Sequence, residues 1–301
     1  MRACRRILAV AGFAAFLAPL AATSPLNAQG LPPLIFGQPS DDENEPSPYQ
    51  KLKEKADEKA KEYAIQPFKL IVGIGAYAAP EYLGGKRYEF GPMPILDVNW
   101  RDRIWLRGRT LGANIYRNSW IRFGPVIRVD TGRDSSHSDH IDGIHDINPS
   151  AEIGGFVEGT YNLPGPNHKL ALRLAAYQGI AGGHGGTIVR TRLQYTRRFL
   201  IAFYVQANVF ANWASGPYMR SYFSVTQADA ERTYFPTYKA KAGFRDVGTS
   251  VALTMSFAEH WGLLVRARYA RLLGNAADSP IVKDGGSADQ FFIGAGIFYR
   301  Y

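Results

Sequence analysis

The C-terminal segment, residues 291–301, alternates strictly between apolar residues and others, and it ends on an aromatic residue. Counted back from the end, every second position is apolar: Tyr301, Tyr299, Ile297, Ala295, Ile293 and Phe291. A period of two predicts a β-strand with one apolar face. A strand of about 9–11 residues with an apolar outer face is what a transmembrane β-barrel requires. The last strand of a soluble sheet would show the same period, so this segment alone leaves both folds open.

A closing strand of this kind also serves as a recognition signal for barrel assembly. Bacterial outer-membrane barrels commonly end on such a strand, and the barrel-assembly machinery reads its terminal aromatic residue. We therefore predict an outer-membrane assembly signal made of Phe291, Ile293, Ile297, Tyr299 and Tyr301. Tyr301 stands where the last residue is usually Phe.

The N-terminus has the pattern of a secretory signal peptide, predicted to be residues 1–28. Its basic start contains Arg2, Arg5 and Arg6. An apolar run from Ile7 to Leu20 follows, then small residues that allow a cut after Ala28. The apolar run is too short for a comfortable membrane helix. The only cysteine, Cys4, leaves with the signal, so the mature chain is predicted to have no disulfide and no cysteine metal ligand.

Export limits the partners that the charge of the chain suggests. The formal net charge is +9, and loss of the three signal-peptide arginines lowers it to +6. A basic balance often indicates nucleic acid, but an exported protein has no nucleic acid in reach. Anionic lipid headgroups, lipopolysaccharide, peptidoglycan and anionic solutes are the better candidates.

Residues 29–66 differ in composition from the rest and are predicted to be a periplasmic arm. Five prolines and the acidic patch 41–45 indicate an extended segment. Ser47 and Pro48 then have the pattern of a helix start, and apolar residues recur at helical spacing over 48–64. A short polar helix is expected there, either as a spacer or as an element that docks a partner.

Residues 67–301 are predicted to form an all-β transmembrane antiparallel barrel of about twelve strands, with ten or fourteen as alternatives. Apolar residues alternate with polar ones in successive segments, as in 121–130, 169–177, 199–209, 250–257 and 261–269. The predicted short periplasmic turns are Asn99–Arg103, Arg117–Ser119, Leu163–Asn167, Arg197–Arg198 and Ala258–His260. The predicted long extracellular loops are Ala78–Tyr88, Gly132–Asn148, Ala181–Gly185, Ala211–Thr237 and Leu273–Gln290. A tight reversal at Gly108–Thr110 completes the count of twelve.

An ordered set of short motifs resembles one family of outer-membrane proteins. The motifs are Gly73-Ile-Gly75-Ala-Tyr77, Pro80-Glu-Tyr82-Leu-Gly84, Gly132-Arg133-Asp134, Asp142-Gly-Ile-His-Asp146, Tyr222-Phe-Ser-Val-Thr-Gln-Ala228, Ala242-Gly-Phe-Arg-Asp-Val247 and Asp278-Ser-Pro-Ile-Val282. Over about 73–301 they resemble the MltA-interacting protein (MipA/OmpV) family, in the same order. Ser224 stands where the family usually has Gly.

The resemblance implies a barrel in the outer membrane of a Gram-negative bacterium. It also implies a scaffold that links the membrane to a lytic transglycosylase and a peptidoglycan synthase. The family brings no catalytic residues, so we expect a non-enzymatic protein without a cofactor.

One loop concentrates groups that bind metals. His137, Asp139, His140, Asp142, His145 and Asp146 lie within ten residues, and imidazoles with carboxylates are ligands for Zn²⁺ and related ions. A hydrated extracellular loop explains the same composition, and the Asp-Gly part matches the family pattern. No metal site is predicted. A protease site at the barrel rim is a more remote alternative, since no second acidic pair supports it.

A basic lumen is the second feature with chemical potential. The predicted lumen-lining residues are Arg122, Arg128, Arg173, Arg190, Arg192, Arg266 and Arg268. Rings of arginine favour anions in pores, so a small anion-preferring porin is the alternative function. Pairing with lumen acids such as Asp130, Glu152 and Glu158 would make the same arginines structural.

Overall fold

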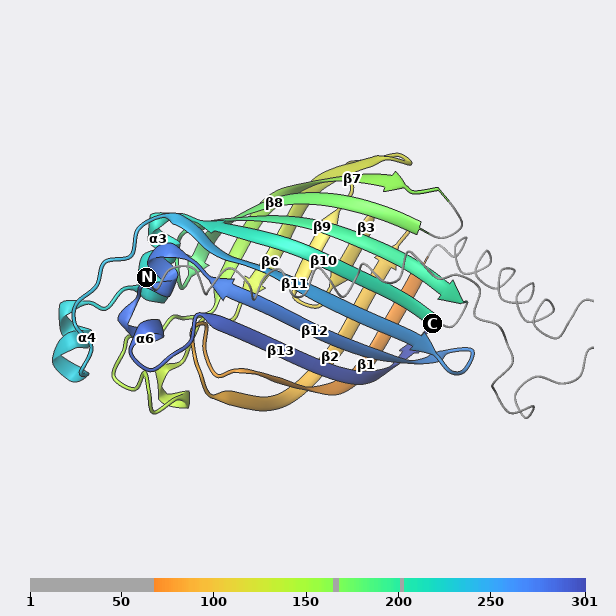
Figure 1. The fold of residues 1–301 in the computed structure, drawn as a ribbon. Helices are drawn as coiled ribbons and strands as arrows, with labels where there is room; N and C mark the ends of the chain where they lie inside the picture. The colour runs from red at the N-terminus through yellow and green to blue at the C-terminus, as the bar shows by residue number, and fades with distance from the viewer. Residues whose placement is uncertain (1–67, 165–167, 201–202) are drawn as a thin grey trace, which may run out of the picture. The chain divides into compact units, whose positions relative to one another are not determined.

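The computed structural model describes residues 68–164, 168–200 and 203–301. These residues form a closed antiparallel barrel of twelve strands with one additional short strand (Figure 1). The predicted signal peptide and the predicted periplasmic arm with its helix lie outside the described residues. None of the helices in the described part of the chain is long and apolar enough to cross a membrane.

The strands follow one another around the barrel in chain order. Their bounds are β1 Phe68–Pro80, β2 Tyr88–Trp100, β3 Ile104–Arg107, β4 Thr110–Ala113, β5 Tyr116–Arg117, β6 Ile121–Asp130, β7 Ser150–Asn162, β8 His168–Gly182, β9 Thr187–Leu200, β10 Phe203–Ala214, β11 Gly243–Ser256, β12 Trp261–Leu272 and β13 Asp289–Arg300. The barrel closes where β1 pairs with β13 and where β4 pairs with β6. The additional strand β5 pairs only with β6, so the predicted count of twelve is confirmed.

The predicted reversal at Gly108–Thr110 is present as a very short hairpin, β3–β4. Gly108 has a φ of +54°, a backbone conformation that glycine adopts at little cost. The predicted two short strands in this part of the chain are thereby confirmed.

Alternation along each strand separates an outer face from an inner one. In β13, Phe291, Ile293 and Ile297 are 53%, 57% and 50% exposed, whereas Phe298 is 2% exposed. Exposed apolar residues recur in the same way on β1, β2, β6, β7 and β8. A soluble protein rarely exposes so continuous an apolar surface, while a membrane barrel must. The closing strand therefore has the apolar outer face that the sequence predicts.

One predicted turn is wrong. Arg197 and Arg198 lie inside β9, where they pair with His168 and Tyr204, and β9 continues to Leu200. The two arginines suggested a polar turn, but strand ends that leave the membrane also carry charged side chains. Arg197 covers the ring of Phe199, 4.4 Å from its centroid. The turns predicted at Asn99–Arg103, Arg117–Ser119 and Ala258–His260 lie between strands as expected.

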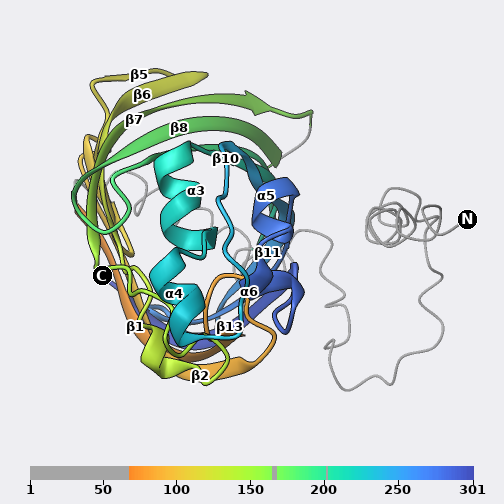
Figure 2. The same ribbon diagram turned by 90° about the vertical axis from the view of Figure 1, so that its left-hand side faces the viewer.

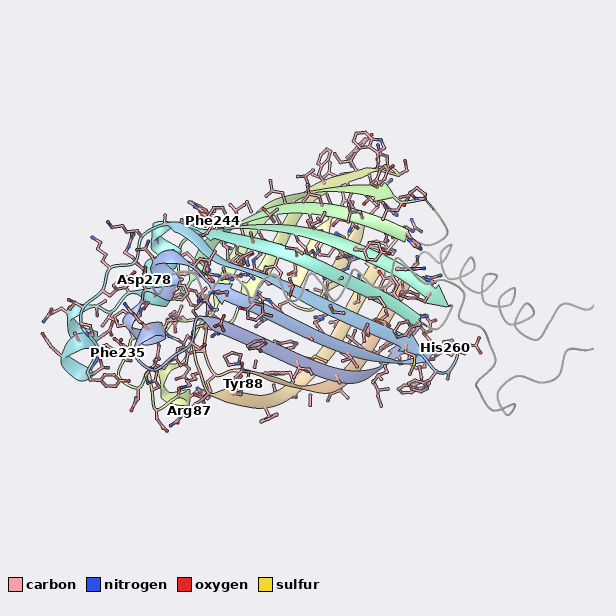
Figure 3. The ribbon with its side chains drawn as sticks, viewed as in Figure 1. Arg87, Tyr88, Phe235, Phe244, His260 and Asp278 are labelled. Carbon is pink, nitrogen blue, oxygen red and sulfur yellow. The ribbon has the colours of Figure 1, made fainter. Side chains whose placement is uncertain are left out.

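The end of the barrel with the long loops, extracellular by the predicted topology, carries all the helices of the described residues. They are η2 Ser135–His137, α3 Gly216–Phe223, α4 Gln227–Arg232, α5 Gly274–Ala277 and α6 Pro280–Lys283. Figure 2 shows α3 and α4 lying across this end. In Figure 3 the labelled Phe235 and Asp278 lie at the same end, whereas His260 lies at the opposite one.

Local sequence explains where α3 and α4 begin. Pro217 occupies the first turn of α3, where its missing N–H costs nothing. Thr226 caps α4 in a capping box with Asp229, each side chain accepting a backbone N–H of the other residue. The buried apolar core lies around these helices and includes Tyr218, Met219 and Phe223.

Candidate functional site

The seven predicted lumen arginines occupy inward positions of their strands. Each alternates along its strand with outward apolar residues, as Arg122 and Arg128 do with Phe123 and Ile127. Arg122, Arg128, Arg173 and Arg268 each have a carboxylate partner. Within the described residues, no ion pair to a carboxylate joins Arg190, Arg192 or Arg266. Four of the seven arginines are thus paired with carboxylates, and the assignment of all seven as a lining that selects anions stays a prediction.

Glu158 pairs with two arginines in the middle of the lumen. Glu158 accepts hydrogen bonds from Arg122 at 2.6 Å and from Arg173 at 3.2 Å. The Arg173 guanidinium also covers the ring of Phe156, 4.0 Å from its centroid, and lies 5.1 Å from that of Trp105. Such cation–π contacts strengthen when water is excluded. These side chains cover the inner wall formed by β3, β6, β7 and β8 at this level.

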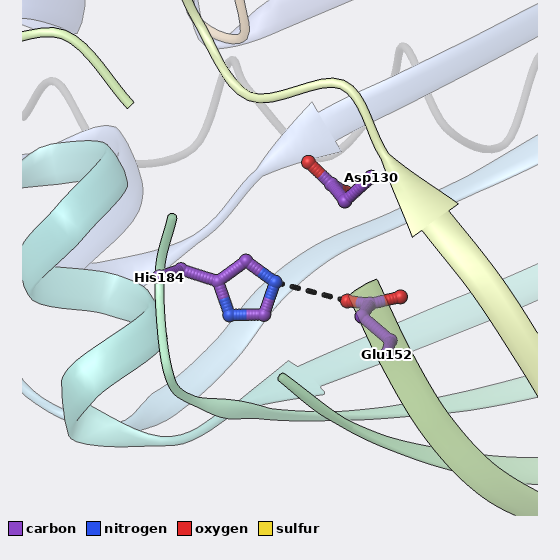
Figure 4. A group of neighbouring side chains, drawn as sticks. All are labelled: Asp130, Glu152 and His184. Carbon is purple, nitrogen blue, oxygen red and sulfur yellow. Dashed lines mark hydrogen bonds and ion pairs between the residues drawn. The ribbon is translucent and has the colours of Figure 1, made fainter. Parts of the chain in front are cut away.

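A buried polar cluster lies above it, where β6, β7 and the loop after β8 meet. Asp130, Glu152 and His184 bring one ligand atom each to within 4.8 Å of one another (Figure 4). The His184 side chain and Glu152 are fully buried, and His184 Nε2 lies 3.0 Å from a Glu152 carboxylate oxygen. Arg128 donates to both Glu152 and Asp130.

The donor and acceptor pattern of this cluster does not suit a metal ion. His184 Nδ1 accepts the backbone N–H of Gly186, so its Nε2 carries the hydrogen that Glu152 accepts. A metal would need that nitrogen without its hydrogen. The carboxylates of Glu152 and Asp130 both already accept a hydrogen bond from Arg128. The cluster is therefore a satisfied ionic network, which buried charges require.

The network binds α3 into the mouth of the barrel. The rings of Tyr218 and Tyr222 stack on each other at 4.7 Å, and His184 packs against Tyr218, also at 4.7 Å. The Tyr222 hydroxyl donates to Asp130, and Arg245 donates to the Tyr218 hydroxyl at 2.5 Å. Burial raises the pKa of Tyr222, and its hydrogen bond to Asp130 adds to this. The hydroxyl thus remains a donor over the physiological pH range.

A second set of buried contacts holds α4 and the loop after β6. Arg133 is 7% exposed and donates to the carbonyls of Tyr222 and His145, at 3.0 and 3.1 Å. Asp229, fully buried, accepts from the backbone N–H of His145 at 2.9 Å, and the His145 ring lies 2.8 Å away. Burial alone would raise the pKa of Asp229, but the hydrogen bonds from Thr226 and His145 hold it well below its usual range.

The six His and Asp residues of the same loop do not converge. His137 pairs with Asp134, Asp139 with Arg87, and His140 with Tyr234. His145 turns to Asp229, and Asp146 accepts from Ser135. Burial and nearby Arg87 lower the pKa of His140, so this ring is neutral at pH 7. Asp142 is exposed. The other five groups serve separate local contacts, and the described residues of this loop form no shared ligand set.

Helices α3 and α4, residues 216–232, form a plug in the mouth of the barrel. Sequence reasoning missed the residues that matter most for this plug. His184, Tyr218, Tyr222, Arg245 and Asp246 were not singled out for this role, although Asp130 and Glu152 were expected to pair with arginines. His184 lies in a glycine run that predicts only a flexible hairpin loop. The available signals were local: Pro217 two residues after Ser215, and Thr226 three residues before Asp229.

Solved structures similar to this chain are membrane barrels. The NanC porin is 8% identical, with a TM-score of 0.40 over 77% of this chain and 98% of that one. The outer membrane channel DcaP of Acinetobacter baumannii is also 8% identical, with a TM-score of 0.40 over 78% and 96%. OmpT, an outer membrane protein of Vibrio cholerae, is 7% identical, with a TM-score of 0.36 over 78% and 96%. These values transfer no property of those proteins to this chain. No curated protein sequence matches it.

The family is defined by sequence. The model of the MltA-interacting protein MipA family matches residues 72–301, which contain every described strand except the first residues of β1. The match agrees with the closed barrel, its apolar outer face and the motif order given above. The chain is thus an outer-membrane β-barrel protein that belongs to the MltA-interacting protein MipA family.

Proposed function

We propose that the protein is a non-enzymatic scaffold of the Gram-negative outer membrane that connects this membrane to peptidoglycan-remodelling enzymes. The family description names an interaction with MltA, which we take to be a lytic transglycosylase. A peptidoglycan synthase is the second proposed partner. Lipopolysaccharide and the barrel-assembly machinery are its proposed partners within the membrane.

The observation that carries the proposal is the anchored plug at the extracellular mouth. α3 is fixed by buried ionic and aromatic contacts to β6, the loop after β8 and β11. A permanent plug suits a protein whose task is position rather than transport. It does not favour the alternative of an anion-preferring porin.

We assign the partner contacts to the predicted periplasmic arm, residues 29–66. The test is photo-crosslinking in cells from a photoreactive amino acid at Tyr49 or Tyr63, followed by mass spectrometry. The matched control carries the same group at Tyr234, which follows α4 and is 68% exposed at the end of the barrel that carries the helices.

Capture of a lytic transglycosylase or a peptidoglycan synthase from the arm, and not from Tyr234, is the expected result. Capture of assembly chaperones alone from Tyr49 and Tyr63 would reduce the arm to a spacer and refute the assignment. Loss of the captured enzyme on deletion of 29–66 would provide an independent check on a barrel that still assembles.

A further inference from the structure

The wall of the barrel is incomplete beside β2. β1 pairs with β2 along its whole length, from Tyr88 to Trp100. On its other side, β2 pairs with β3 only from Asp97 to Trp100, and the Leu96 carbonyl accepts the N–H of Gly108 at the tip of the β3–β4 hairpin. Among the described residues, no strand pairs with this edge of β2 over 88–95. At about 3.4 Å per residue, the open edge is roughly 25 Å long.

The sequence of the open edge fits an absence of a neighbouring strand. The hydrogen bonds at Leu96 and Trp100 show that even-numbered residues of β2 direct their backbone groups toward β3. Two of the even positions above Leu96 are Pro92 and Pro94. Proline has no N–H to donate, and within sheets it occurs on edges. The edge is therefore protected against pairing with another strand.

Other contacts frame the opening. The hairpin tip forms its floor, where the Val129 N–H donates to the Arg109 carbonyl. The loops after β1 and β6 meet above it through the ion pair of Arg87 with Asp139, at 2.9 Å. At the level of the floor, β2 and β6 lie three strand spacings apart, about 14 Å. The opening thus lies in the upper half of the wall, beside the outward Phe90, which is 85% exposed.

The inner wall next to the opening is apolar apart from Glu89 near its upper end, whose carboxylate accepts a hydrogen bond from the Tyr77 hydroxyl at 3.0 Å. Inward residues of β1, β2 and β13 there include Tyr77, Met93, Ile95 and Phe292. Glycines on the same inner wall leave room for them: an added Cβ at Gly294 would lie 2.7 Å from the Met93 sulfur, and one at Gly296 would lie 2.9 Å from Ile95 Cδ1. This surface differs from the cationic wall formed by β6 to β9.

A cation without a carboxylate partner lies directly beside this apolar surface. Arg266 on β12 is paired in register with Gly294 of β13, the residue that Met93 covers. Its side chain is exposed in the lumen, and no hydrogen bond or ion pair joins it to another described residue. Arg192 is a second inward arginine without a carboxylate partner in the described part of the chain.

We propose that the opening beside β2 gives lateral access from the outer leaflet to a lumen site for a single-chain anionic amphiphile. The acyl chain lies along Met93 and Ile95, and the anionic head group binds Arg266. Burial of the alkyl chain against these apolar side chains favours binding, and charge-assisted hydrogen bonds to a guanidinium fix the head group. This site is independent of the scaffold function, because it uses the barrel wall and not the periplasmic arm.

The test is photolabelling of the refolded mature barrel in phosphatidylcholine nanodiscs with a palmitic acid that carries a diazirine in its chain. Labelled residues are mapped by mass spectrometry. Because side chains alternate between the two faces, inward Met93, Ile95 and Phe292 report the lumen, and outward Phe90 and Ile293 report bulk lipid. Labels on the inward residues that excess palmitate displaces are expected. Labels on outward residues alone would overturn the proposal.

Two matched comparisons test whether Arg266 binds the anionic head group and whether the ligand enters through the opening beside β2. Arg266→Gln should reduce inward labelling roughly tenfold, as expected for the loss of one charge-assisted hydrogen bond, whereas Arg122→Gln, whose carboxylate partner keeps Arg173, should not. In a double variant with Phe90→Cys and Thr131→Cys, a bis-maleimide that links the two cysteines across the opening should suppress inward labelling. The control is the same double variant with each cysteine blocked by a monofunctional maleimide. Equal labelling in either comparison would refute that part of the proposal.

Discussion

Removal of the Glu152 charge should release the plug. Glu152 is fully buried and binds both Arg128 and His184, which packs under α3. Glu152→Gln leaves the buried Arg128 with Asp130 alone. Breaking one partner of a buried ion pair costs about 3–5 kcal/mol. Since 1.4 kcal/mol is a factor of ten, the population with a released plug should rise by a factor of roughly 10² to 4 × 10³.

Limited proteolysis of the refolded barrel measures this population. Trypsin should cut at Arg220 and Arg232 in the Glu152→Gln variant much faster than in the wild type, because both lie in the α3–α4 segment. The control is Glu158→Gln, which removes the same charge from a pair of arginines that do not touch α3. Equal cutting of the two variants, or no gain in Glu152→Gln, would refute the role of the network as an anchor.

Three further changes should have distinct effects. Gly75→Ala should lower the free energy of unfolding, measured by urea titration, by about 1–3 kcal/mol, because the added Cβ would lie 2.0 Å from the Ala295 carbonyl oxygen. Gly155→Ala is the control and should be neutral, because its Cβ would lie 3.7 Å from the nearest atom, the Gly124 carbonyl oxygen. The lowered pKa of Asp229 stabilises the α4 loop above the unfolded value of about 3.9, and this stabilisation is lost as pH falls through the folded pKa. Hydrogen exchange in 227–234, corrected for intrinsic rates, should therefore rise in acid, and Asp229→Asn should flatten the dependence. Deletion of Tyr301 should reduce assembly in cells but not refolding in detergent; equal losses in both would contradict a signal read by the assembly machinery.

The sequence predicts the barrel well because its pattern is local. A period of two is readable in 121–130, 169–177, 199–209, 250–257, 261–269 and 291–301, and the positions of the arginines follow from it directly, as Arg173 alternates with Leu172 and Leu174. Gly108 marks a reversal because positive φ is nearly specific to glycine. The prediction of a turn at Arg197–Arg198 was wrong because a charged pair at a membrane boundary is compatible with a strand as well as with a turn.

The plug was not predictable in the same way, because its stability is tertiary. α3 and α4 have eight and six residues, too few to form helices in water without packing partners. Asp130, Glu152 and His184 come from three segments, and no spacing in the chain shows that they meet. The open edge of β2 likewise depends on how far a different hairpin extends, although Pro92 and Pro94 were visible in the sequence.

Recording from the refolded wild-type barrel in a planar lipid bilayer tests the central claim, a barrel closed by its own anchored plug, most directly. We expect no steady current above that of the bare bilayer. We also expect that Glu152→Gln opens a conductance and that Glu158→Gln does not. A steady anion-selective conductance of the wild type, reduced by Arg122→Ala or Arg266→Ala, would contradict the account and establish an open porin.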